Sequence, residues 1–136
     1  KTLYSLTSHE GANVFSKDTI KQADLNLKAN TGSRQNLTLD LNTLGTTAVT
    51  GATINLSGKV EYHDTSTSTG AEINAVKLIT TEPYANAPSG GILEIIANKE
   101  LEASSKLGGI INVHSKTEKI IEKIAIGGVI NYRYDQ

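Results

Sequence analysis

The sequence contains no cysteine, no methionine and no tryptophan, and only one phenylalanine and two prolines among its 136 residues. The absence of cysteine excludes a disulfide framework, a cysteine-based zinc site and a thiol nucleophile. Charge is balanced, since 13 Lys and Arg stand against 14 Asp and Glu, and this balance excludes a polybasic nucleic-acid-binding surface. No apolar run of about 18 residues occurs, so we expect no membrane span. The length is sufficient for a core of its own and predicts a single domain over residues 1–136.

The short motifs that carry catalysis or cofactor binding are also missing. There is no GxGxxG, no Walker loop, no HExxH, no EF-hand loop and no GxSxG. His9, His63 and His114 lie far apart without metal-ligand spacing, and we expect all three on the surface. We therefore predict no catalytic, cofactor-binding or metal-binding residue, and a protein that is not an enzyme.

What the sequence does contain is a repeat of 19 residues. Glycines recur at this spacing, except at one repeat position, where Ser89 stands and is followed by Gly90. Two further columns accompany these positions: isoleucines three residues later and asparagines four residues later. The three columns are Gly32, Gly51, Gly70, Gly108 and Gly127; Gln35, Ile54, Ile73, Ile92, Ile111 and Ile130; and Asn36, Asn55, Asn74, Leu93, Asn112 and Asn131. We predict no insertion between the units of residues 32–136. Residues 1–31 match the repeat poorly, and this predicts an N-terminal cap with an atypical first repeat.

Within each unit the apolar residues alternate with polar ones, as they do in half-buried strands. Ile54, Leu56, Val60 and Tyr62 form one such alternating set, with Gly58 in the remaining position. Residues 117–125 space their isoleucines as a short helix would, but we favour a strand there. The segments 65–69 and 81–91 are rich in Thr, Ser, Pro and Gly, and this composition predicts loops.

A constant period favours a β-solenoid, because each coil stacks on the next and every column of side chains meets itself about 4.8 Å away. Stacked asparagines would form an amide ladder, and a glycine at each corner suits a turn with positive φ. The alternative is an antiparallel β-sandwich, in which successive hairpins have no reason to be equal in length. The sequence therefore predicts an all-β, parallel β-helix-like solenoid.

The units of the form TG-x-x-INL resemble the rungs of parallel β-helices in secreted filamentous adhesins and phage tail spikes. The resemblance extends over about residues 31–134 and concerns rung length, the asparagine column and the glycine corner. It implies an architecture and transfers no functional residue.

Coil stacking suggests one candidate cluster, because the 19-residue spacing would place His63 and Glu82 on adjacent coils, near Asp64 and Glu102. Such a cluster would bind a divalent cation or handle a proton, whereas the more common interpretation is a solvated charged face.

Other candidates are columns of hydroxyls and amides. A threonine array would suit ice or glycans, although Thr is an ordinary strand former; its members are Thr31, Thr50 and Thr69 in one column and Thr46 and Thr65 in another. Asn36 and Asn55 match the glycosylation sequon, and we predict both to be unmodified because the ladder occupies their amides.

The leading functional hypothesis is a non-enzymatic structural or assembly protein of an extracellular fibre, a surface adhesin or a virion spike. It would associate through open strand edges with itself, as a homo-oligomer or filament, or with a longer parent chain. The alternative is a carbohydrate-binding adhesin module that binds glycans with Tyr62, Tyr84, Tyr132 and Tyr134, and a polysaccharide-degrading enzyme is a third hypothesis. Because the chain begins at Lys1 and has no Met, we expect a removed leader or a trimmed segment, and an extracellular, cell-surface or virion location.

Overall fold

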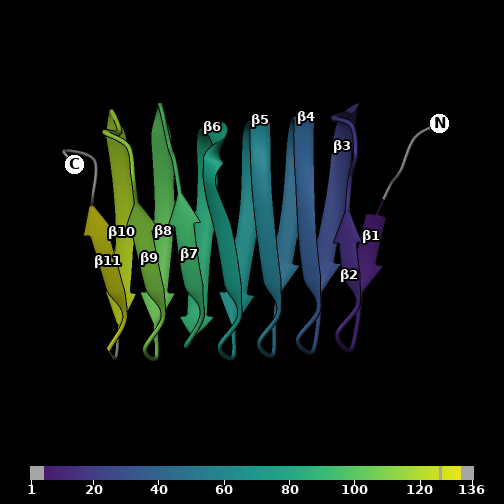
Figure 1. Ribbon diagram of the computed structural model, residues 1–136. Coiled ribbons are helices and arrows are strands. Elements are labelled where there is room, and N and C mark those ends of the chain that lie inside the picture. Colours follow the sequence, from purple (N-terminus) through teal and green to yellow (C-terminus); the bar gives the residue numbers. More distant parts are fainter. Residues whose placement is uncertain (1–4, 126, 133–136) are drawn as a thin grey trace.

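The computed structural model describes residues 5–125 and 127–132, and over these ranges the chain forms strands and turns but no helix. It follows that no helix in the described part of the chain could cross a membrane. The coils stack side by side as a β-solenoid of about seven turns (Figure 1). Every pair of hydrogen-bonded strands is parallel, so the solenoid prediction is confirmed and the antiparallel sandwich is wrong. The strands are β1 (Ser5–Ser8), β2 (Asn13–Phe15), β3 (Ile20–Ala29), β4 (Arg34–Ala48), β5 (Thr53–Ser68), β6 (Glu72–Ser89), β7 (Ile92–Ile95), β8 (Glu100–Lys106), β9 (Ile110–Val113), β10 (Lys119–Ala125) and β11 (Val129–Tyr132).

Each coil is flattened and has two faces. The first face contains β2, β7, β9, β11 and the N-terminal parts of β4, β5 and β6. The second face contains β1, most of β3, β8, β10 and the C-terminal parts of the same long strands. Between the faces two successive residues point outward, for example Asn42 and Thr43, and the alternation of buried and exposed residues then changes phase.

Tight turns close the opposite edge of the coils and lie together at the lower edge of Figure 1. Most of the described turns have two successive residues with positive φ, but at Ser89 and Gly90 only the glycine does. In the coil of Thr50 and Gly51, both turn residues have positive φ, 54° and 73°, and the N–H of Ala52 donates to the carbonyl of Val49 at 3.3 Å. This is type I′ geometry, which glycine adopts freely and a β-branched residue adopts only with strain. The N–H of Gly51 also donates to the Thr69 carbonyl at 3.1 Å, which joins neighbouring turns. The glycine-corner prediction is confirmed.

The core lies between the two faces of each coil. Ile54 pairs in register with Ile73, and Ile111 with Ile130, as the repeat predicts. The middle of the coil is filled by large aliphatic side chains, whereas small residues such as Ala48 are buried next to the tight turns. We attribute this taper to the two-residue turn, since faces that meet there leave little room for a larger side chain.

The coils are not all equal in length. Asn55 pairs with Asn74, 19 residues on, but Ser57 pairs with Lys77, 20 residues on, so β6 contains an extra residue at a β-bulge. The next coil is one residue shorter, since Ala87 pairs with Ser105. The prediction of no insertion is therefore wrong, because a one-residue gain is followed by a one-residue loss that restores the average period.

The bulge changes the columns of the repeat. Ile73 pairs with Leu93, and Asn74 pairs with Glu94. The sequence placed Ile92 in the isoleucine column and Leu93 in the asparagine column, and each of these positions is one residue too early. Glu94 therefore occupies the position that asparagine holds in the other coils.

The loops predicted from composition are mostly strand. Residues 65–68 end β5, and residues 81–89 belong to β6. Pairing with neighbouring coils outweighs composition here, because Thr and Ser form strands readily when both edges are paired. Pro88 lies within the second irregularity of β6, between Asn86 and Ser89, where a residue without an N–H is tolerated. The strand favoured for residues 117–125 is confirmed as β10.

Candidate functional site

His63 lies in the core and not on the surface as predicted. Its side chain is only 2% exposed, and its Nε2 lies 2.8 Å from the Thr46 hydroxyl, which donates to the Thr65 hydroxyl, also at 2.8 Å. Because Thr46 has a single hydroxyl proton, it accepts a hydrogen bond from the ring, and this places the ring proton on Nε2. His63 thus contributes to the packing of the interior.

The proposed cluster of His63 with Glu82 does not form. The bulge in β6 pairs His63 with Pro83, while Glu82 pairs with Tyr62 on the outer surface. Burial also lowers the pKa of His63 to about 3, and its Nδ1 has no hydrogen-bond partner among the described residues. The ring is therefore neutral near pH 7. Within the described ranges, no group of three or more His, Asp or Glu side chains is arranged to hold a metal ion.

The second face carries two exposed tyrosines among carboxylates. Tyr62 is 47% exposed and Tyr84 is 39% exposed, and they belong to adjacent coils. Tyr62 pairs with Glu82, and Tyr84 pairs with Asp64, so rings and carboxylates alternate between β5 and β6. Tyr62 points outward, as the glycan hypothesis requires and against the alternation that begins at Ile54, because Glu61 and Tyr62 are the two successive outward residues at the bend of this coil.

A shallow hollow of about 220 Å³ lies over these residues, and we call it the tyrosine groove. It continues from β5 and β6 onto β8 and β10, where Glu102 pairs with Tyr84. The side chains that define it are Tyr62, Glu82, Tyr84, Glu100, Glu102 and Lys119.

Acceptors and a donor are both present in the tyrosine groove. The pKa of Glu82 is raised, first by the hydrogen bond between its side chain and Glu100, then by desolvation and by repulsion from that carboxylate. Nearby Lys99 opposes the shift. The Lys119 Nζ lies 3.5 Å from a carboxylate oxygen of Glu100. The groove therefore combines two aromatic rings with groups that accept and donate hydrogen bonds.

The asparagine column forms a partial ladder on the first face. The Asn55 amide donates to Asn36 at 2.8 Å, and the Asn131 amide donates to Asn112 at 2.9 Å. At the bulged coil the column continues through Glu94, which accepts from the Asn112 amide at 2.5 Å and lies 2.6 Å from a ring nitrogen of His114. These side chains bind one another, so the column stabilises the stack; that the sequons at Asn36 and Asn55 are unmodified stays a prediction.

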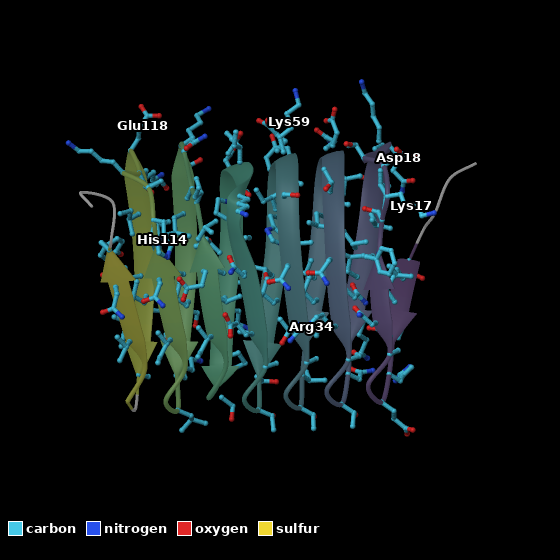
Figure 2. The ribbon with its side chains drawn as sticks, in the orientation of Figure 1. Lys17, Asp18, Arg34, Lys59, His114 and Glu118 are labelled. Atoms are coloured by element: carbon cyan, nitrogen blue, oxygen red, sulfur yellow. The ribbon has the colours of Figure 1, made fainter. Side chains whose placement is uncertain are left out.

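His114 is therefore also less exposed than predicted, because Glu94 holds its ring against the first face (Figure 2). Asp18, Lys59 and Glu118 lie at the upper edge in that view, opposite the tight turns.

The threonine columns do not form a common surface. Thr31, Thr50 and Thr69 are exposed turn residues with positive φ. Thr46 and Thr65 are buried beside His63. The geometry therefore provides no flat hydroxyl array across the two columns.

Within residues 5–125 and 127–132, no strand covers the C-terminal end of the solenoid. Ile120 pairs with Leu101, which is 1% exposed, yet Ile120 itself is 39% exposed, and Ile124 is 52% exposed. All seven residues of β10 are exposed, since β10 pairs with β8 alone. On the first face, β11 pairs with β9 alone in the same way. Among the described residues, Ile120 and Ile124 continue the interior with Glu122 between them, and the edges of β10 and β11 lie open. Figure 1 shows these two strands as the last of the stack.

Tyr132, a third tyrosine of the glycan hypothesis, does not join Tyr62 and Tyr84. Tyr132 pairs with buried Val113, so it continues an interior column at the open end, and its hydroxyl donates to the Glu122 carboxylate. Tyr134 lies outside the described residues. A four-tyrosine surface is therefore wrong, and the two-tyrosine groove replaces it.

Comparison with known proteins identified a family for this chain. A family model described as "Putative auto-transporter adhesin, head GIN domain" matches residues 1–116, which is most of the chain. Neither the search of curated proteins nor the search of solved structures found a match.

Proposed function

We propose a structural role for this chain, which belongs to the family described as auto-transporter adhesin, head GIN domain. Membership in this family indicates an adhesin-like protein of the cell surface or the extracellular space. We propose further that it is non-enzymatic and that its solenoid associates end to end, with copies of itself or with further coils of a longer parent chain. The family favours the adhesin over the virion spike among the hypotheses drawn from the sequence.

The observation that carries this proposal is the open C-terminal coil. In a parallel ladder, alternate residues direct their backbone groups to opposite neighbours. The N–H of Lys119 donates to the Lys99 carbonyl at 3.1 Å, so Ile120 and the alternate residues after it direct theirs toward the open edge. Unpaired strand edges beside exposed isoleucines are a template for another strand.

The N-terminal end offers a matching parallel edge. β1 pairs with β3 alone and covers part of the first coil, where Leu6 and Ile20 pack against the core while remaining partly exposed. A second copy that placed its β1 beside β10 would continue the parallel sheet. Because this contact joins two different ends, it is heterologous and does not close, which favours a filament over a dimer.

Absence of catalysis has two supports. The sequence lacks catalytic motifs, and the one histidine that stacking placed beside carboxylates, His63, is buried in the core.

Sedimentation velocity over a range of concentrations, with electron microscopy of the most concentrated sample, tests the association. Ile124→Lys places a charge in the contact without disturbing the single chain, because Ile124 is exposed there. Leu107→Lys is the matched control, since Leu107 is 56% exposed at the tight turn of the preceding coil and is not part of the open edge. We expect the parent and L107K to form oligomers or fibres and I124K to stay monomeric.

A parent protein that is monomeric at every concentration, or an I124K variant that assembles like the parent, would contradict the association. Proline at Val129 is a poorer test, because the Val129 N–H donates to the Gly109 carbonyl at 2.9 Å within the chain. That substitution would damage the coil itself.

A further inference from the structure

We infer that the tyrosine groove binds an uncharged oligosaccharide of about three sugar rings. The inference rests on the adhesin part of the proposed function and names the class of ligand. It does not depend on end-to-end association.

The aromatic rings are the first argument. Tyr62 and Tyr84 are both more than a third exposed, and they are neighbours on one surface rather than scattered singly. They lie one coil apart and two residues apart along the strand, and residues in this diagonal relation are roughly 7–8 Å from each other. The rings thus present two apolar platforms, each with a hydroxyl, on one surface.

The polar groups narrow the ligand to one with hydroxyls. Sugar hydroxyls donate and accept, and the groove offers carboxylate acceptors at Glu82 and Glu102 together with the ammonium of Lys119. A ligand with negative charge would be repelled by the carboxylates. A simple cation would use the acceptors but would compete with Lys119, which already lies beside Glu100. An uncharged polyhydroxyl ligand uses both kinds of group.

The length of the groove sets the size of the ligand. It crosses β5, β6, β8 and β10, and three intervals of about 4.8 Å give about 14 Å, close to three sugar rings in a row. Buried Pro83 and Leu101 support it from below, and parallel pairing on both sides of β6 and β8 holds its backbone. The site is therefore preorganised, which lowers the entropic cost of binding.

The test measures binding to four immobilised neutral trisaccharides, built from glucose, mannose, galactose or N-acetylglucosamine, with a hyaluronan oligosaccharide and polylysine as charged probes. We expect at least one neutral trisaccharide to bind. Tyr62→Ala and Tyr84→Ala should each weaken that binding by about tenfold or more, because each removes one stacking platform. Phe15→Ala is the matched control, since Phe15 is an aromatic residue 65% exposed on the first face, and it should leave the dissociation constant unchanged.

Two results would overturn the inference. One is the failure of all four neutral trisaccharides to bind. The other is binding to polylysine alone that disappears between about 0.15 M and about 0.5 M salt, which would identify a basic protein segment as the ligand. Circular dichroism of both tyrosine variants confirms that they remain folded. Sugar binding by monomeric I124K would separate this inference from end-to-end association, since either can fail without the other.

Discussion

Acid should destabilise this protein through a single buried side chain, His63. The folded chain holds its pKa at about 3, against 6.5 for the free side chain, because burial penalises the charged ring. Protonation would charge the ring inside the core, where Nδ1 has no partner to accept its new proton. The unfolded chain therefore binds a proton below pH 6.5 that the folded chain does not bind until about pH 3. The contribution of His63 to the free energy of unfolding is therefore fully present above pH 6.5 and is lost as the pH falls from 6.5 toward about 3.

The size of the effect follows from the two pKa values. Between pH 7 and pH 5 the unfolded chain becomes almost fully protonated at this position while the folded chain stays neutral, and the free energy of unfolding falls by about 2 kcal/mol. Because the side chain is fully buried, solvent screening does not reduce this figure appreciably.

Urea unfolding of the parent and of His63→Leu at pH 7 and pH 5 measures the effect. Leucine suits this position, since the paired residue on the preceding coil is Leu44, and Thr46 keeps its bond to Thr65. Carboxylates elsewhere titrate equally in both proteins, so the difference between them isolates the histidine. We expect the parent to lose about 2 kcal/mol more than H63L over this interval. Equal losses in the two proteins would refute the reasoning.

Two further substitutions test the interior and the turns. Ile73→Asp should reduce the free energy of unfolding by at least about 4 kcal/mol or prevent folding, because a carboxyl without a partner would replace a fully buried isoleucine. Glu61→Lys at the exposed bend should change this free energy little. Thermal melts in which Glu61→Lys is the less stable variant would show that inside and outside are misassigned. Thr50→Asn should raise the midpoint of urea unfolding by an amount equivalent to about 0.5–1 kcal/mol, because asparagine tolerates the positive φ of a type I′ turn better than a β-branched residue does. A lowered midpoint would contradict the assigned turn geometry.

Much of the fold follows from the sequence because a repeat of constant length leaves few alternatives. A column such as Ile54 and Ile73 meets itself only if successive coils stack in parallel, and the recurring glycines mark one corner of the coils directly. The open-ended stack and its parallel strand edges follow from the same argument.

The second corner of each coil carries no such marker, and this is where sequence reasoning failed. Two outward residues in succession, Glu61 and Tyr62, shift the alternation by one residue. That shift turns Tyr62 outward into the groove and His63 inward to Thr46. Either orientation fits the local composition, so the choice depends on where the coil bends.

The bulge in β6 was equally hidden, because the shorter coil after it restores the average period. It moves Glu82 opposite Tyr62 and Glu94 into the asparagine column, so it sets the composition of the tyrosine groove and of the ladder. The sequence by itself determined the stacking, since side-chain columns spaced at one coil length can be buried only by neighbouring coils. Only the tertiary structure decided which side chains meet on each face, because a one-residue change of register reverses every side chain that follows while leaving the repeat almost unchanged.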